Sequence, residues 1–173
     1  MVDDWSRELT THTGMQFTVR PAKPADEAAL GEFFTHVTAE DLRFRFLSAV
    51  KTVGHDRLAA MTDIDHRTTE NFLAFVDGET AIVATAMLAC DDALETGEVA
   101  IAIRSDHKAK GISWELLAHV AAYAQAKGLT TLQSVESCDN HAAIDMERQM
   151  GFVAKPYPGD STLVLVQRRL KQL

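Results

Sequence analysis

A short cationic turn is the part of this sequence best suited to chemistry. Residues Lys108–Ser113 read Lys-Ala-Lys-Gly-Ile-Ser, between a stretch of alternating apolar residues and a stretch with apolar residues at helical spacing. Such a turn directs several backbone N–H groups, the positive end of a helix dipole and two lysine side chains towards one point. The pattern favours a phosphate site, and an ordinary strand-to-helix connection with solvated lysines is the alternative.

The spacing of the turn distinguishes it from two common phosphate loops. The chain contains no G-x-x-x-x-G-K-[ST] motif, and no G-x-G-x-x-G motif follows a strand. The turn resembles instead the pyrophosphate loop of the GNAT N-acetyltransferases, which is written [QR]-x-x-G-x-[GA] and is followed by a long helix. Lys108 stands at the first position of this pattern, Gly111 at its glycine and Ser113 at its last position, so the two end residues depart from it in type.

A second segment with the same resemblance lies downstream, in residues 140–152. Its sequence is similar to the GNAT motif N-x-x-A-x-x-L-Y-x-x-x-G-F, with Asn140 at the first position and Gly151 at the glycine. The residues themselves predict a helix that Asp139 or Asn140 caps and that a left-handed glycine ends. Because a strand is expected between the two segments, over residues 131–136, their order also resembles that of the GNAT superfamily.

The N-terminal half narrows the resemblance. Several short segments look like parts of the acetyltransferase domain of bacterial Pat-type protein lysine acetyltransferases: Val19–Pro21, Ala25–Glu27, Leu42–Ser48, His55–Leu58 and Thr62–Asp65. The resemblance implies a mixed α/β (α+β) GNAT fold, in which a mostly antiparallel sheet of about six or seven strands is flanked by helices and splayed where the cosubstrate acetyl-CoA binds. The acyl-CoA synthetase-like and cyclic-nucleotide-binding regions of many Pat-type proteins fall outside this sequence, so we expect a free-standing catalytic domain.

The resemblance implies roles for individual residues. Glu98 matches the glutamate that acts as general base, which is needed because an amine with a pKa of about 10.4 is protonated at neutral pH. A plain surface carboxylate beside the turn at residues 95–97 is the alternative for Glu98. The resemblance also implies three groups of cofactor-binding residues. The backbone of Ile101, Ile103 and Arg104 would pair with the pantetheine arm, and Asn140 would contact that arm from the other side. The pyrophosphate would be held by Lys108, Ala109, Lys110, Gly111, Ile112 and Ser113. Ser113 is also expected to cap the helix that follows.

Three further residues have less definite roles. Glu147 stands where the family has a tyrosine that protonates the leaving thiolate, but we expect a solvated helix residue and assign no general acid. Trp114 is expected to pack on a neighbouring helix, with a position over the adenine as the alternative, and Cys138 to be a small buried apolar residue near the thioester. The histidines show no metal-ligand spacing, so no metal is expected.

The remaining elements must hold this site in place. Residues 1–16 are polar without a clear period and predict a flexible N-terminal arm, while residues 17–173 predict a single domain. The dipeptide Asp77-Gly78 predicts the turn of a hairpin. Strands are expected at residues 17–21, 71–76, 81–89, 98–104 and 131–136 and in a closing hairpin of Val153 with 161–168. Five helices are expected: one that starts at Pro24, one that Thr38 caps, one at 55–62, one that follows the glycine turn and ends at Lys127, and one at 140–150.

Composition limits the class of protein and its partners. The chain has 173 residues, two cysteines and a formal net charge of −8. The acidic balance disfavours a nucleic-acid partner, no apolar run reaches the roughly 18 residues of a membrane span, and the start Met-Val-Asp-Asp is unlike a signal peptide. We therefore expect a cytoplasmic protein with no nucleic-acid or membrane partner, and a homodimer is compatible with the sequence.

These observations predict an acetyl-CoA-dependent N-acetyltransferase whose acceptor is a primary amine, with a protein lysine as the leading candidate. The region joining Phe34 to Thr62 is expected to form the acceptor-side wall, where a cationic lysine would be attracted by Glu40, Asp41, Asp63 and Asp65. Two alternatives stay open: a small-molecule amine acetyltransferase and a non-catalytic acyl-CoA-binding sensor. The basis for the sensor is the departure from the family patterns at Lys108, Ser113 and Glu147.

Overall fold

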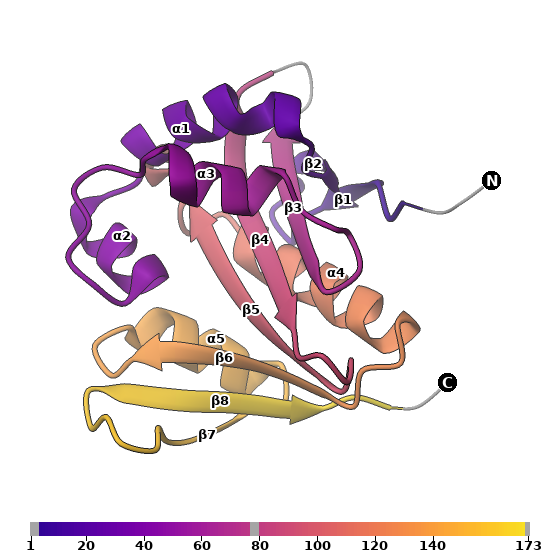
Figure 1. Ribbon diagram of the computed structural model, residues 1–173, viewed down its shortest axis with the longest axis vertical. Coiled ribbons are helices and arrows are strands. Elements are labelled where there is room, and N and C mark those ends of the chain that lie inside the picture. The colour runs from indigo at the N-terminus through magenta and orange to yellow at the C-terminus, as the bar shows by residue number, and fades with distance from the viewer. Residues whose placement is uncertain (1–3, 77–79, 172–173) are drawn as a thin grey trace.

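The computed structural model describes residues 4–76 and 80–171, and one mixed sheet of eight strands runs through this part of the chain (Figure 1). The strands are β1 (Arg7–Thr10), β2 (Gln16–Pro21), β3 (Thr69–Val76), β4 (Ile82–Cys90), β5 (Thr96–Ile103), β6 (Thr131–Ser137), β7 (Val153–Pro156) and β8 (Leu163–Arg169). They lie in the order β1-β2-β3-β4-β5-β6-β8-β7, and only β5 and β6 are parallel among the described strands. The expected mixed, mostly antiparallel fold is confirmed, with more strands than expected.

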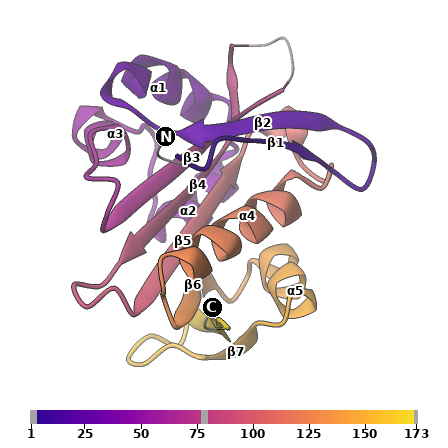
Figure 2. The same ribbon diagram turned by 90° about the vertical axis from the view of Figure 1, so that its right-hand side faces the viewer.

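Helices cover both faces of the sheet (Figure 2). The helices are α1 (Glu27–Thr35), α2 (Ala39–Phe46), α3 (His55–Thr62), α4 (Ile112–Ala126) and α5 (His141–Gln149), with 3-10 turns η1 (Pro24–Asp26) and η2 (Ser105–His107). The first three helices lie on one face of the sheet, and α4 and α5 lie on the other. The molecule therefore has three layers, with the sheet in the middle.

The alternation of side chains along the central strands fills two separate cores. Phe72 of β3 is fully buried in the core that includes Leu116 of α4. Leu73, the next residue, is fully buried in the core that includes Leu30 and Phe33 of α1. Residues 72–75 of β3 are apolar because both faces of this strand are covered. The strands predicted at 71–76 and 81–89 are confirmed as β3 and β4. Asp77-Gly78, the predicted turn between them, lies outside the described residues.

Strand β1 occupies part of the segment for which the sequence predicts a flexible arm. It pairs with β2 in antiparallel register, Leu9 opposite Phe17 and Arg7 opposite Val19. The prediction of a flexible arm is therefore wrong for residues 7–10. The strand was not recognised in the sequence because Arg7 is one of its inward residues, so apolar and polar residues do not alternate. Arg7 places its guanidinium 4.9 Å from the ring centre of Trp5, and Trp5 packs against the core under α4.

The ends of the helices match the sequence predictions only in part. Thr38 caps α2 as predicted, since its hydroxyl oxygen accepts the N–H of Asp41 at 3.1 Å. Asn140 stands at the N-cap position of α5, but its side chain caps nothing and donates instead to Glu136 Oε2 at 3.2 Å. Ser113 lies within α4, whose N-cap is Gly111, so the prediction that Ser113 caps this helix is wrong.

The parallel strands β5 and β6 form a fork in the middle of the sheet. They pair over three residues each, Thr96–Glu98 with Thr131–Gln133, and then separate. Beyond this point β5 stays with β4, while β6 stays with β8 (Figure 1). The splayed sheet implied by the resemblance is therefore present, and it opens directly after Glu98.

Candidate active site

A cavity of about 510 Å³ occupies the fork between β5 and β6. One wall is the edge of β5 from Val99 to Ile103, and the opposite wall is residues 134–136 of β6 together with α5. The glycine turn and the first residues of α4 close one end, and residues of α2 line it from the other face of the sheet. The cavity is thus built by segments that lie far apart in the sequence.

Most of the predicted cofactor-binding residues line this cavity. They are Ile101, Ile103, Lys108, Ala109, Gly111, Ile112, Ser113 and Asn140. Arg104 and Lys110 were also expected and are not among the lining residues. The backbone of Arg104 already has partners, because its N–H donates to Val83 O at 2.8 Å and its carbonyl accepts from His107 N at 2.9 Å. The N–H of Arg104 is therefore already paired within the protein, which disfavours the predicted backbone contact with a ligand.

The glycine turn depends on a backbone that other residues adopt rarely. Gly111 has a φ of +89°, in the left-handed region. A Cβ atom at this position would lie 2.8 Å from His12 Nδ1 and 3.2 Å from Thr11 Cβ. The loop between β1 and β2 is thus packed directly against the turn, and His12 lines the cavity. His12 could not be recognised from the sequence as part of a site, because it falls in the segment predicted to be flexible.

The turn concentrates hydrogen-bond donors and positive charge. In α4 the intrahelical ladder starts at Glu115, whose N–H donates to Gly111 O at 3.3 Å, so the N–H groups of Ile112, Ser113 and Trp114 precede it. Lys108 forms an ion pair with Asp41 of α2, with 2.7 Å between Nζ and Oδ2. Trp114 lines the cavity and is 38% exposed, so the expectation that it packs on a neighbouring helix is wrong for much of its surface.

The wall formed by β6 and α5 carries a buried cluster of polar groups. Glu147 is 3% exposed, and its Oε2 accepts a short hydrogen bond from the hydroxyl of Ser134. Its Oε1 is buried and accepts from no N–H or hydroxyl group among the described residues, but the carboxyl groups of Glu147 and Glu136 share a hydrogen bond. Glu136 lies close by and accepts from Asn140. The prediction of a solvated Glu147 is wrong, because Ile144 and Glu147 lie three residues apart on the same buried face of α5.

The surroundings of the cluster favour a protonated carboxyl group. Burial raises the pKa of Glu147 to about 9, and the nearby charge of Glu136 adds to the effect. Burial also raises the pKa of Glu136, while hydrogen bonds from Glu147, Ser134 and Asn140 oppose that shift. The pair is therefore expected to hold one proton at neutral pH, on Glu147.

Glu98 lies at the point where the fork opens. Its side chain is exposed, does not line the cavity itself and accepts from Gln133 Nε2 at 3.4 Å. Along the strand it shares a face with Ala100 and Ala102, both of which line the cavity. Glu98 is thus next to the cavity, on the side of the sheet that α2 covers.

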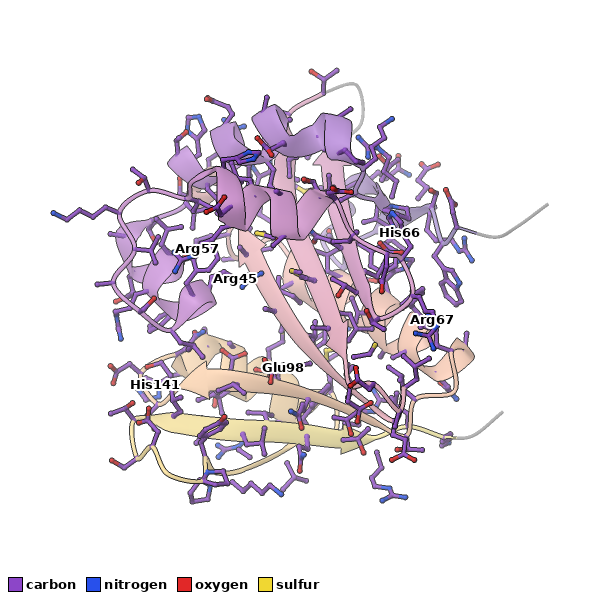
Figure 3. The ribbon with its side chains drawn as sticks, in the orientation of Figure 1. Arg45, Arg57, His66, Arg67, Glu98 and His141 are labelled. Atoms are coloured by element: carbon purple, nitrogen blue, oxygen red, sulfur yellow. The ribbon has the colours of Figure 1, made fainter. Side chains whose placement is uncertain are left out.

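Arg45 of α2 is a lining residue that the sequence did not reveal as part of a site. Burial lowers the pKa of Arg45 to about 10, and the charge of Glu98 opposes this shift. Its Nε is buried without a hydrogen-bond partner, and its guanidinium lies 4.9 Å from the ring centre of Phe46. Figure 3 places Arg45 and Glu98 on the same side of the sheet, near the opening of the fork.

One other expectation concerns Cys138. Cys138 is exposed and does not line the cavity, so the prediction of a buried apolar residue near the thioester is wrong. Among the residues that the structure describes, no three His, Cys, Asp or Glu side chains are grouped so that they could hold a metal ion. Within the same residues, no helix has the length and apolar character needed to cross a membrane.

Comparisons with known proteins agree with this geometry. Acetyltransferase PA5475 of Pseudomonas aeruginosa is 29% identical over 165 residues, which cover 94% of this chain and 88% of that protein. The GNAT domain of S. lividans PAT superposes with a TM-score of 0.90 at 20% identity and covers 98% of this chain and 99% of its own. The structure of yncA from Salmonella typhimurium, with its cofactor acetyl-CoA, has a TM-score of 0.71 at 22% identity and covers 91% of this chain and 95% of its own.

The family comparison covers the fork, the glycine turn and α5. Residues 36–152 match the acetyltransferase (GNAT) family. This range contains both the segment that resembles the pyrophosphate loop and the motif that starts at Asn140. The chain therefore belongs to the GNAT acetyltransferase family.

Proposed function

We propose that this GNAT acetyltransferase transfers the acetyl group of acetyl-CoA to a primary amine, and that the acceptor is a lysine side chain of a protein. The observation that carries the proposal is the cavity in the fork, which extends from the glycine turn to the residues of β5 beside Glu98. A thioester held along this cavity has phosphate-binding groups at one end and a carboxylate at the other. This is the arrangement that acyl transfer to an amine requires.

The donor would lie along the edge of β5 that faces the cavity. Beyond Glu98, β5 has no ladder with β6 in the described chain, so the backbone from Val99 to Ile103 can pair with the amides of a pantetheine arm. The pyrophosphate would meet the N–H groups at the start of α4 and the charge of Lys108. Trp114 offers a partly exposed ring at the same end of the cavity, which suits an adenine.

Glu98 would take the proton from the attacking ammonium group. Its carboxylate lies at the last pair of the β5–β6 ladder, where an amine that enters from the α2 side would meet the acetyl group. Proton removal would be direct or through one water molecule. The guanidinium of Arg45 lies on the same side of the sheet, close enough for its charge to interact with that of Glu98.

The acceptor side of the cavity suits a long, flexible amine. Ala100, Ala102 and Phe44 line it with apolar surface, against which the methylene stem of a lysine can pack. Glu40 of α2 and Asp63 at the end of α3 are exposed carboxylates that would attract the ammonium group as it approaches. Asp65 is less suited to this role, because its Oδ1 accepts backbone N–H groups of residues 67–69.

Arg45 favours a second candidate acceptor, a small amine that also carries a carboxylate. The Nε of Arg45 is buried beside the cavity without a partner, and a guanidinium is a good partner for a carboxylate. An amino-acid-like substrate could place its ammonium near Glu98 and its carboxylate near Arg45. A panel of lysine peptides and free amines with and without a carboxylate, followed by mass spectrometry, separates the two candidates.

The central test of the proposed function is Glu98→Gln, with Glu95→Gln as its matched control. Glutamine keeps the size of the side chain and can still pair with Gln133, but it cannot take a proton. We expect Glu98→Gln to lower turnover about 10²-fold near neutral pH, with acetyl-CoA affinity nearly unchanged and a smaller loss at high pH, where the amine deprotonates without help. Glu95 is an exposed carboxylate in the preceding turn, so its variant should keep parental turnover. Equal turnover of the parent and Glu98→Gln would show that Glu98 is not the base.

A further inference from the structure

A row of polar side chains crosses three strands of the sheet and ends at Glu98. Glu98 stands opposite Gln133 of β6 in the parallel ladder, and Gln133 stands opposite Gln167 of β8 in the antiparallel ladder. Side chains at opposite positions of paired strands point to the same face of the sheet, so these three lie side by side. Hydrogen bonds follow the row: Gln167 Nε2 donates to Gln133 Oε1 at 2.9 Å, and Gln133 Nε2 donates to Glu98 Oε1 at 3.4 Å. The row therefore links the candidate base on β5 to the strands on the other side of the fork.

Resting on the amine acetylation proposed above, we infer that Gln133 is a positioning residue that holds the carboxylate of Glu98 at the opening of the fork, and that Gln167 keeps Gln133 in the required orientation. An exposed glutamate has several rotamers, and only some of them place its carboxylate beside the cavity. Gln133 holds Glu98 through Oε1, which leaves Oε2 to take the proton of the ammonium group, directly or through a water molecule. Gln133 itself does not line the cavity, so it acts on the reaction through Glu98.

The carboxylate at the end of the row fixes the direction of both hydrogen bonds. An ionised carboxylate only accepts hydrogen bonds, so Gln133 must present its NH2 group to Glu98 and its carbonyl oxygen to Gln167. Gln167 must then present its own NH2 group to Gln133, as observed. A rotated Gln133 amide would place oxygen against oxygen at Glu98 and NH2 against NH2 at Gln167. Each glutamine thus has one favourable orientation, and that of Gln167 supports that of Gln133.

Gln133 is the donor among the two cross-strand neighbours of Glu98. The residue opposite Glu98 on β4 is Ala89, which has no polar group in its side chain. Arg45 lies on the same side of the sheet, but its Nη2 donates to Met87 Sδ at 3.5 Å, and no hydrogen bond joins it to Glu98 in the described part of the chain. A pair of amides between strands can serve stability alone. Here the row ends at the last residue pair of the β5–β6 ladder, beside the cavity, which a purely structural pair does not require.

Methionine is the matched substitution for both glutamines, because it keeps the length of the side chain and removes the amide group. The hydrogen bond to Glu98 is long and its carboxylate is exposed, so Gln133→Met should lower kcat by about 5-fold. The acceptor KM and the acetyl-CoA affinity should stay nearly unchanged. Gln167→Met should lower kcat by about 2-fold, since it removes only the bond that orients Gln133. Gln16→Met, at an exposed position of β2, is the control and should keep the parental kcat.

A double-variant cycle with Glu98→Gln separates positioning from a structural role. In the Glu98→Gln background there is no base to position, so Gln133→Met should cause no further loss of kcat, whereas independent effects would multiply. Losses that multiply would show that Gln133 acts independently of Glu98 and would overturn the inference. Parental kcat in Gln133→Met, together with an impaired Glu98→Gln, would overturn the positioning role and leave the proposed function intact.

Two further outcomes are decisive. If Gln133→Met does not fold, Gln167→Met decides in the parent and in the Glu98→Gln background, since Gln167 does not line the cavity. Its loss of kcat should then appear in the parent background alone, and equal losses in both backgrounds would overturn the inference. Parental turnover in Glu98→Gln would overturn the proposed base and the positioning role together, and a parent that acetylates no amine would overturn the proposed function itself.

Discussion

Replacing Gly111 by alanine should separate two requirements of the glycine turn, the left-handed backbone and the close approach of the β1–β2 loop. The φ of +89° should cost an alanine about 1–2 kcal/mol. The added Cβ would also lie 2.8 Å from His12 Nδ1 and 3.0 Å from His12 Cε1, so the ring must move. Overpacking of a rigid core costs about 1–3 kcal/mol, but His12 is exposed and its ring can turn aside, so the cost here lies at or below the lower end of that range. We therefore expect Gly111→Ala to lower the free energy of unfolding by about 2–3 kcal/mol.

Gly128 provides a matched control within the same chain. Its φ is +88°, and a Cβ atom there would have no neighbour within 4 Å. Gly128→Ala should therefore report the backbone cost alone, about 1–2 kcal/mol. Urea unfolding of both variants gives the difference, which measures the approach of His12. Acetyl-CoA affinity, measured by calorimetry, should fall in Gly111→Ala and stay parental in Gly128→Ala.

The double variant Gly111→Ala/His12→Ala tests the cause of that difference. If the imidazole of His12 is the obstacle, its removal should recover most of the excess loss over Gly128→Ala, although Thr11 Cβ, at 3.2 Å, still limits the space. Equal losses in Gly111→Ala and Gly128→Ala would refute the argument, because they would mean that the loop moves aside without cost. Glycine would then be required at position 111 only because of its positive φ.

Three further changes have definite expected outcomes. Asp26→Asn breaks the paired contact with Arg20, whose two hydrogen bonds are each 2.8 Å long, and should lower the free energy of unfolding by about 1–2 kcal/mol at pH 7. The hydrogen bond from Arg20 lowers the pKa of Asp26, so this stability is present above the unfolded pKa of about 3.9 and is lost as the pH falls. Urea unfolding of parent and variant should therefore converge in acid. Lys108→Ala should weaken acetyl-CoA binding only by about a few-fold, because Lys108 is also paired with Asp41, and calorimetry should show a smaller loss at about 0.5 M salt than at low salt. An affinity unchanged at both salt concentrations would exclude Lys108 from the phosphate site. For a lysine acceptor, KM should rise with ionic strength in steady-state kinetics, and Asp63→Asn should reduce that dependence; a KM indifferent to both would exclude electrostatic attraction by this region.

The sequence predicted those parts of the fold and site that depend on short-range patterns. The alternation before the turn, the turn itself and the helix after it could be recognised because their signals lie within about twenty residues of one another. The Thr38 cap is equally local and is confirmed. Strand β1 was missed because Arg7 lies where an apolar residue would have completed the alternation.

The errors in the site have a common physical origin in contacts between distant segments. His12 and Arg45 reach the cavity only because β1 and α2 pack beside segments far along the chain. The buried face of α5 could have been inferred from the spacing of Ile144 and Glu147, but a glutamate on that face argues locally for solvent. The pairing of Asn140 with Glu136 likewise competes with a capping role that the local sequence favours. In each case a tertiary partner decides what the side chain does.

The fork has a consequence for what can enter the molecule. An unpaired strand edge usually invites any extended chain to add to the sheet. Here the edge of β5 is one wall of a cavity that residues of α4, α5 and α2 also line, which disfavours a broad polypeptide with side chains on both faces. A slender, unbranched molecule with amide groups spaced along its length can pair with this edge. Only three residue pairs join β5 to β6 in the described chain, and a bound molecule of this kind would pair with β5 where β6 does not. Because such a molecule binds the folded protein, mass action predicts that the melting temperature rises with its concentration.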